Sequence, residues 1–302
     1  MRVAAIDCGT NSVRLLVADA DGGALREVHR ETRIVRLGQG VDRTGVLAPE
    51  ALERTRAALA DYAATIAALT AQRVRLVATS ATRDAANRDE FAALVRATLG
   101  VDAEVVSGTE EAALSFAGAV EALPDAPRPL LLADIGGGST ELVLGSSDAL
   151  RAHSMNIGAV RMTERHLHDD PPTGEQVAAA IADVRAALEV AALDVPLDIP
   201  AALVGVAGTV TTVAALVLEL SRYDSARIHG SVLSATAVHA VTARLLAMTH
   251  GERAAHAVIA PGRVDVIAGG ALVLSTLIER LGVRELVVSE HDILDGIALS
   301  LR

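Results

Sequence analysis

The sequence predicts an α/β protein built from two similar lobes. Residues 130–144 consist of an apolar run, a turn with three glycines and a second apolar run, a pattern typical of a β-hairpin. The same pattern stands at residues 3–16, aligned without a gap at an offset of about 127 residues. Strand-length apolar runs and helical segments alternate through the rest of the chain. Two such hairpins predict two lobes with a cleft between them.

The tips of both hairpins have the composition of a phosphate site. Three consecutive glycines remove every Cβ from the second turn, so its amides can point into one concavity, and hydroxyl side chains add donors. A glycine-rich turn that binds nothing is the alternative for either motif alone, and the repetition favours the anion site. The tip residues expected to contact phosphate are Asn11, Ser12, Gly136, Gly137, Gly138 and Ser139.

Acidic residues beside the tips point to a metal ion. Asp134 precedes the second turn, and a carboxylate there repels phosphate unless a cation lies between them. Asp7 holds the corresponding place in the first hairpin, and Glu141 follows the second tip. We expect these three residues to serve a magnesium site, with manganese as an alternative and a monovalent cation as a further candidate.

Composition limits the core and the partners. Of the 302 residues, 51% are hydrophobic and 1% aromatic, so small aliphatic side chains must fill the core. Every basic residue is arginine, so any side-chain phosphate clamp must be an arginine fork. The net charge of −11 argues against nucleic-acid and membrane-surface binding, and a polyanion requires local positive potential. The single cysteine, Cys8, is expected to be an inert core thiol, and the absence of a leader or a membrane-length apolar span predicts a cytoplasmic protein.

Four motifs together resemble one family. They stand at 7–12, 107–112, 134–141 and 205–209, in the order and spacing of the exopolyphosphatase and guanosine pentaphosphate phosphatase family. This family is part of the superfamily of actin, sugar kinases and heat-shock chaperones. The resemblance covers nearly the whole chain, and it implies two ribonuclease-H-like, actin-like ATPase lobes and a homodimer.

The resemblance also implies catalytic residues. The family places an anion-contacting arginine in the loop after the strand expected at 74–78, which matches Arg83, and a salt bridge to a neighbouring acid is the alternative. The family's general base is the second glutamate of an adjacent pair, which matches Glu111. Adjacent helical residues point about 100° apart, so one of Glu110 and Glu111 can face the cleft, but the residues alone do not say which.

A further anion site is expected where the strand at 202–206 turns into a helix. Gly208 and Thr209 form that turn, and the amides of a helix N-terminus attract anions. In the family this turn lies along the substrate channel. Arg263, ahead of the helix expected at 267–281, is a candidate clamp, and Arg33 and Arg36 are others unless they belong to a solvated loop.

The proline-rich segment 123–129 separates the two repeats, so we expect domains at 1–122 and 123–302, with the last helix crossing back towards the first. Capping boxes are predicted for the pairs at 87/90 and 173/176, and the His and Asp residues at 166–170 are interpreted as solvated. Residues 294–296, Leu-Asp-Gly, depart from the Leu-Arg-Glu-Gly common in the family, and no role is assigned to them.

The leading functional hypothesis is an exopolyphosphatase. It would release terminal orthophosphate from short-chain inorganic polyphosphate by metal-assisted attack of a water that a glutamate activates. Few arginines are available as clamps, which favours short chains and distributive cleavage. The alternatives are a guanosine pentaphosphate 5'-phosphohydrolase, an ATP-dependent sugar or acetate kinase, and a non-catalytic protein that binds guanosine tetraphosphate or polyphosphate. The sequence does not decide between polyphosphate and the guanosine nucleotide.

Overall fold

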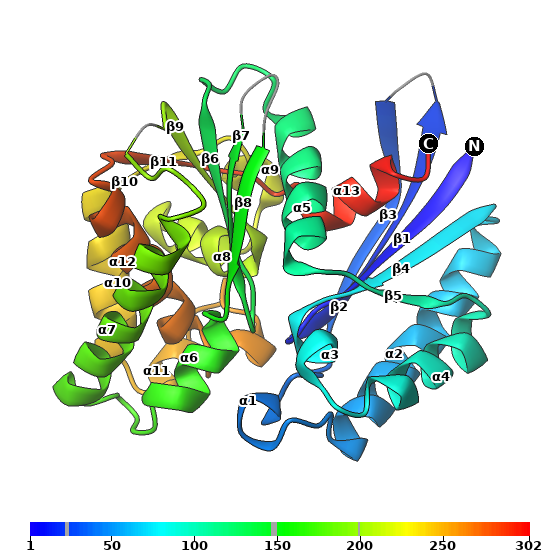
Figure 1. Ribbon diagram of the computed structural model, residues 1–302, viewed down its shortest axis with the longest axis horizontal. Coiled ribbons are helices and arrows are strands. Elements are labelled where there is room, and N and C mark those ends of the chain that lie inside the picture. Colours follow the sequence, from blue (N-terminus) through cyan, green and yellow to red (C-terminus); the bar gives the residue numbers. More distant parts are fainter. Residues whose placement is uncertain (22–23, 146–149, 199) are drawn as a thin grey trace. The chain divides into compact units, whose positions relative to one another are not determined.

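Figure 1 shows the protein as a computed structural model that describes residues 1–21, 24–145, 150–198 and 200–302. The chain is an α/β protein with two compact units, one containing residues 1–118 and 292–302 and the other residues 119–291. The chain leaves the first unit within α5 (Gly108–Ala122), just ahead of the proline-rich segment, and it returns at Asp292.

The first unit is built on a five-stranded sheet with the order β3-β2-β1-β4-β5. β1 (Arg2–Cys8) pairs antiparallel with β2 (Ser12–Asp21) and parallel with β4 (Arg73–Ala78). β3 (Ala24–Ile34) and β5 (Ala103–Val105) form the two edges. β1 is an almost continuous apolar run because its alternate side chains enter two different cores, one on each face of the sheet.

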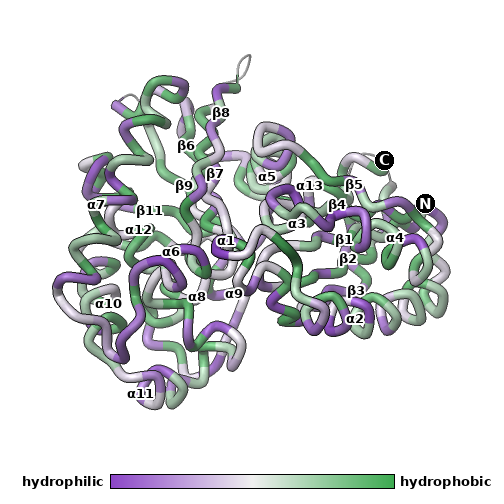
Figure 2. The backbone as a smooth tube through the Cα atoms, turned by 60° about the horizontal axis from the view of Figure 1, so that its bottom comes forward, coloured by the Kyte–Doolittle hydropathy of each residue, from purple (hydrophilic) through white to green (hydrophobic). Residues whose placement is uncertain are grey.

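One of these cores lies under α2 and α4, and the other lies under α13. Figure 2 shows hydrophobic and hydrophilic colour alternating along α2, as expected for a helix with one buried face. The described helices of this unit are α1 (Val41–Thr44), α2 (Pro49–Ala68), α3 (Ser80–Asp84), α4 (Arg88–Leu99), α5 and α13 (Ile293–Leu299).

The second unit repeats the plan of the first. Its sheet has the order β10-β11-β9-β6-β7-β8, in which β8-β7-β6-β9-β11 corresponds to β3-β2-β1-β4-β5 with the same strand directions. This confirms the two similar lobes. The strands are β6 (Leu130–Ile135), β7 (Thr140–Gly145), β8 (Leu150–Met155), β9 (Ala202–Val206), β10 (Val232–Ser234) and β11 (Glu285–Val288).

The core of the second unit is organised around α12, which is buried along most of its length and carries mostly hydrophobic colour in Figure 2. The described helical segments are α6 (Ala159–His166), α7 (Gly174–Ala191), α8 (Ala207–Val217), α9 (Ser225–Ile228), α10 (Ala235–Ala247), α11 (His250–Ala254), the 3-10 turn Pro261–Arg263 and α12 (Ile267–Leu281). In the parts of the chain that the structure describes, no helix is long and apolar enough to cross a membrane.

Several local expectations need correction. The loop expected after the strand at 74–78 is the short helix α3, Ser80–Asp84. Asn87 forms no capping box, because its side chain exchanges hydrogen bonds with the backbone of Leu47 at 2.8 and 3.1 Å. The capping box of Thr173 and Gln176 is confirmed.

The polar segment 166–170 is tied to neighbouring elements. His166 lies 2.8 Å from Asp183, and Asp170 accepts a hydrogen bond of 2.8 Å from Arg253, whose side chain is buried. The side chain of Asp170 remains 44% exposed, as expected for a solvated residue, and it also serves as the charged partner that the buried guanidinium of Arg253 needs.

Two glycines allow α13 to touch α5 directly. A methyl group at Gly118 would lie 2.0 Å from the carbonyl oxygen of Asp292, and one at Gly296 would lie 1.9 Å from that of Leu114. No side chain fits at either position. The segment 294–296 therefore allows the close packing of α13 on α5. Asp295 of the same segment also accepts a hydrogen bond of 2.6 Å from Arg30 of β3.

We expect Gly296→Ala to lower the free energy of unfolding by about 1–3 kcal/mol, because the added methyl group must push two backbones apart. Gly251→Ala in α11 is the matched control: its methyl group meets no atom, and alanine favours a helix by about 0.5–1 kcal/mol. Urea unfolding followed by circular dichroism measures both. Equal stability of the two variants would contradict the packing described for α5 and α13.

Candidate functional site

The two hairpin tips close with the same hydrogen bond. In the first, the amide of Gly9 donates to the carbonyl of Ser12 at 2.9 Å, and in the second, the amide of Gly136 donates to the carbonyl of Ser139 at 3.0 Å. The predicted correspondence between the motifs therefore holds at the level of single backbone atoms.

Helix α6 fixes the orientation of the second tip. Its first two amides donate to the carbonyls of Gly136 and Gly137 at 2.9 and 2.8 Å, and Nε of Arg161 donates to the carbonyl of Gly138 at 2.7 Å. In a planar trans peptide the N–H points opposite to the C=O. The amides of the next three peptide units, up to that of Ser139, therefore point away from α6, as an anion cradle requires.

The first tip is oriented in a similar way. The carbonyl of Thr10 accepts a hydrogen bond of 2.8 Å from the amide of Gly38, and the carbonyl of Asn11 accepts two, of 3.0 and 2.9 Å, from successive amides after β3. The amides of Asn11 and Ser12 consequently point away from this loop. Both tips present backbone donors in the direction that the sequence analysis required.

The side chains beside the two tips differ in charge. Asp134 faces Glu141 in the register of β6 and β7, and at the corresponding place of β1 and β2 Asp7 faces Arg14. Residues directly opposite one another in an antiparallel pair extend from the same face of the sheet. The second hairpin therefore brings two acids together, whereas the first brings together an acid and a base.

Both acids of the second hairpin are buried, with Asp134 6% and Glu141 1% exposed. Ser154 of β8 donates a hydrogen bond of 2.6 Å to Glu141. Among the described residues no three His, Cys, Asp or Glu side chains converge as a metal cage. Magnesium does not need one, because it commonly takes one or two carboxylates and fills its shell with water and phosphate oxygens. Asp134 and Glu141 fit that mode.

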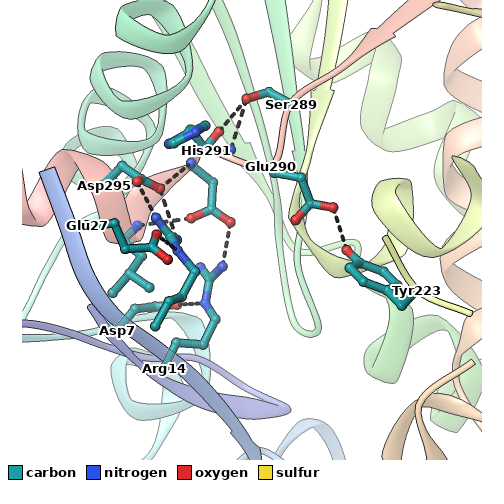
Figure 3. A network of polar contacts seen from close by, with 11 residues as sticks. Asp7, Arg14, Glu27, Tyr223, Ser289, Glu290, His291 and Asp295 are labelled. Atoms are coloured by element: carbon teal, nitrogen blue, oxygen red, sulfur yellow. Dashed lines mark hydrogen bonds and ion pairs between the residues drawn. The ribbon is translucent and has the colours of Figure 1, made fainter. Parts of the chain in front are cut away.

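Asp7 does not fit a metal ligand. Nε and Nη2 of Arg14 donate to its Oδ2 at 2.9 and 2.7 Å, and its Oδ1 is enclosed without a described hydrogen-bond partner. Figure 3 shows Arg14 beside Asp7. Arg14 also donates to Asp292, the N-cap of α13. Burial lowers the pKa of Arg14, but the charges of Asp292 and Asp7 outweigh it and raise that pKa above its ordinary value. Arg14 is therefore a permanent cation between two carboxylates.

The two predicted catalytic residues lie together. Nη1 of Arg83, on α3, donates to Glu111 of α5 at 2.9 Å and to the carbonyl of Val106 at 3.0 Å. Glu111 is 7% exposed, whereas Glu110 is exposed and lies 3.5 Å from Arg75. The expected division of the glutamate pair is therefore present, with Glu111 on the inner side.

Arg83 retains donors for a ligand. Its Nε and Nη2 make no hydrogen bond to any residue that the structure describes, and its side chain is 23% exposed. An arginine can offer these two nitrogens as a fork to a phosphate. Arg83 does form a salt bridge, but its partner is the candidate base Glu111 and not the neighbouring acid that we weighed as the alternative.

The turn at the start of α8 is covered by the predicted arginine. A methyl group at Gly208 would lie 2.1 Å from Nη2 of Arg263, so the guanidinium rests directly on this glycine. Thr209 is 6% exposed, and its hydroxyl lies close to Gly270 of α12. An anion here would therefore meet Arg263 and backbone amides rather than the hydroxyl of Thr209.

Arg33 is engaged within its own unit. It donates to Glu31 at 2.6 Å and also to Asp61, and it lies over the ring of Tyr62. Its charge is therefore matched by two carboxylates, which makes it a poor phosphate clamp.

Three residues important to this arrangement were not singled out from the sequence: Arg14, Arg161 and Asp292. Only Arg14 could have been found from the sequence. The alignment of the two repeats matches Arg14 with Glu141, and so shows that a basic residue in the first repeat corresponds to an acidic residue in the second. Arg161 and Asp292 act through contacts distant in sequence, with a separation of 278 residues between Arg14 and Asp292.

Comparison with known proteins agrees with these features. A family model described as the Ppx/GppA phosphatase family matches residues 16–301. The chain belongs to this family. The resemblance drawn from the four motifs is confirmed.

Individual relatives cover almost the whole chain. Exopolyphosphatase 2 of Mycobacterium tuberculosis is 54% identical over 99% of this chain and 98% of its own length. A solved structure of an exopolyphosphatase-like protein is 46% identical and superposes with a TM-score of 0.97 over 99% of this chain and 97% of the other. A guanosine-5'-triphosphate,3'-diphosphate pyrophosphatase of Aeromonas salmonicida is 29% identical over 99% of this chain and 59% of its own length.

We expect Gly158→Ala to weaken phosphate-substrate binding, because its methyl group would lie 2.5 Å from the carbonyl of Gly137 and displace the glycine tip. Loss of one well-aligned donor to a charged group costs about 1.5–3 kcal/mol, so KM should rise at least about tenfold. Gly174→Ala at the start of α7 meets no atom and is the control. An unchanged KM in a Gly158→Ala protein would show that the second tip does not contact substrate.

Proposed function

We propose that this protein is an exopolyphosphatase that releases terminal orthophosphate from inorganic polyphosphate. The observation that carries the proposal is the 54% identity, along 99% of the chain, to an exopolyphosphatase. The geometry supports it, because each unit presents backbone amides suited to phosphate and the first unit also presents a buried glutamate paired with an arginine.

The roles of the residues follow from their chemistry. The hairpin tips, around Ser12 and Ser139, bind phosphate oxygens through their amides. Arg83 directs its free nitrogens to the phosphate that is transferred, and it neutralises charge on the equatorial oxygens. Arg263 contacts a phosphate farther along the chain through the guanidinium that rests on Gly208.

Asp134 and Glu141 would hold the magnesium ion. When bound, the metal supplies neutralisation of phosphate oxygens. Burial of both carboxylates limits their motion and fixes the position of the ion relative to the glycine tip, whose orientation α6 determines.

Glu111 would act as the general base. It accepts the proton of the attacking water while Arg83 holds its other side, so the carboxylate keeps one orientation. Its place in the first turn of α5 is rigid, because the glycine contacts at Gly118 and Gly296 pack α5 directly on α13.

Short chains are the preferred substrate in this proposal. Of the candidate clamps, Arg33 is matched by two carboxylates, which leaves only Arg36, Arg83 and Arg263 as guanidinium groups for phosphate. With a net charge of −11, the rest of the protein repels a long polyanion. A released product should therefore dissociate before the next cleavage.

A second candidate is the 5'-phosphate hydrolysis of guanosine pentaphosphate. The match to the Aeromonas pyrophosphatase favours it, although that protein is longer than the aligned region. Both substrates end in a linear phosphoanhydride, so the same residues would serve either reaction.

The test is orthophosphate release from short polyphosphate and from guanosine pentaphosphate, measured side by side with magnesium. We expect higher kcat/KM with polyphosphate, and a long polyphosphate digested on a gel should shift gradually downward as a ladder. Preference for the nucleotide would establish the second candidate, and absence of turnover on both would indicate a binding protein. Full-length chains that persist beside free phosphate would contradict distributive cleavage.

Glu111→Gln should lower kcat about 10²–10⁴-fold, because an amide keeps the shape of the side chain but accepts no proton. KM should change only a few-fold. Glu110→Gln is the matched control, since Glu110 is exposed and belongs to the same helical turn. If Glu110→Gln loses activity and Glu111→Gln retains it, the base has been assigned to the wrong glutamate.

A further inference from the structure

The loop between β3 and α1, residues 35–40, holds the first hairpin tip in its orientation. Its first two amides both donate to the carbonyl of Asn11, at 3.0 and 2.9 Å. The amide of Gly38 donates to the carbonyl of Thr10 at 2.8 Å. In a planar peptide the C=O and the N–H point in opposite directions, so whatever fixes this loop also fixes the direction of the tip amides.

The corresponding segment of the second unit is a helix. After β8 the chain forms α6, whose first amides donate to the carbonyls of Gly136 and Gly137, and Nε of Arg161 donates to the carbonyl of Gly138. After β3 the chain forms the turn at 35–40 and then the single turn of α1. The two tips are thus supported from the same place of the repeat, but by different means.

A strained residue stands near the start of the loop 35–40. Arg36 has a φ of +51°, in the left-handed region that residues with a Cβ rarely adopt. Its carbonyl accepts the amide of Gln39 at 3.1 Å, which closes a tight turn. A strained backbone persists only where the surrounding structure holds it. The loop therefore needs support from a neighbouring element.

That support comes from Arg54 of α2. Its Nε donates to the carbonyl of Val35 at 2.7 Å. Its Nη2 lies 3.4 Å from the carbonyl oxygen of Arg36 and 3.4 Å from Oε1 of Gln39. Hydrogen bonds from a charged donor are about twice as strong as neutral ones. One guanidinium therefore joins both ends of the tight turn to α2.

The loop 35–40 also packs on the helix that carries Arg83. A methyl group at Gly38 would lie 2.3 Å from Cγ2 of Thr10 and 2.9 Å from Cβ of Ala81 in α3. Arg83 belongs to the same short helix. A displaced loop would therefore disturb both phosphate-binding groups proposed for the first unit.

From these contacts we infer that Arg54 is a positioning residue for phosphate binding, which acts through the loop 35–40 on the first hairpin tip. This role rests on the proposed function, in which that tip binds phosphate. A tip that holds phosphate equally well before and during the reaction contributes to KM and leaves kcat nearly unchanged.

The experiment compares wild type, Arg54→Gln, Arg54→Lys and Arg56→Gln as full-length proteins, with circular dichroism to verify folding. Arg54 and Arg56 are exposed residues of the same helix, but Arg56 pairs locally with Glu53, so Arg56→Gln is the matched control. Lysine keeps one charged donor within reach of the loop. Kinetics with tripolyphosphate and magnesium give KM and kcat, and hydrogen–deuterium exchange by mass spectrometry follows the opening of residues 35–40.

We expect Arg54→Gln to raise KM about three- to tenfold, to change kcat less than about twofold and to speed exchange at 35–40 at least about threefold. Arg54→Lys should recover most of both losses, and Arg56→Gln should match wild type. Unchanged exchange in Arg54→Gln would show that Arg54 does not hold the loop, and faster exchange with unchanged KM would show that the loop does not position the tip. Either result overturns the inference, as would an equal loss in Arg56→Gln.

The proposed function can fail separately. If wild type turns over neither polyphosphate nor the guanosine nucleotide, the dissociation constant of tripolyphosphate, measured by calorimetry, replaces KM. The same order of the four proteins then supports the role of Arg54. Equal affinity in all four, or no binding by wild type, would overturn it.

Discussion

The largely buried guanidinium of Arg14, whose side chain is 17% exposed, is the constraint on which the first unit depends. It donates to Asp7 at the end of β1 and to Asp292 at the start of α13, and so joins the first hairpin to a helix from the other end of the chain. A buried charge without partners is strongly unfavourable, so α13 must return to this place once β1 and β2 have paired. The position of α13 in turn determines where α5 can lie.

The packing of α5 on α13 connects this ion pair to the candidate base Glu111. Gly118 and Gly296 remove the side chains that would separate α5 from α13, and the two helices pack backbone to backbone. Glu111 stands in the first turn of α5, where Arg83 and the carbonyl of Val106 complete its surroundings. Residues 294–296, which differ from the sequence common in the family and had no assigned role, therefore help to support the helix that carries the candidate base.

The second unit contains a hairpin whose tip closes with the same hydrogen bond as the first. Helix α6 orients its tip: two backbone amides of the helix and the side chain of Arg161 donate hydrogen bonds to the carbonyls of the three glycines. The amides of the tip therefore point away from α6. Its two acids, Asp134 and Glu141, are both buried and face one another across β6 and β7. The two hairpins thus share their backbone hydrogen bonds and differ in the charge of the residue opposite the aspartate.

The sequence by itself determined the two lobes and the glycine tips, because these depend on local strand, turn and helix patterns repeated in register. Arg83 and Glu111 were singled out by the resemblance to the family, and the structure shows that they are paired. The sequence also indicated Gly208 as part of an anion-binding turn and Arg263 as a candidate clamp, and only the structure shows that they are neighbours. It did not reveal that Asp7 pairs with Arg14, nor that Asn87 binds Leu47 instead of capping its helix. Those choices belong to the tertiary structure, because the deciding partners lie far away along the chain, up to 278 residues in the case of Arg14 and Asp292. A polar side chain can bond to local backbone groups or to partners that tertiary packing brings near, and the local sequence pattern does not show which of these it will take.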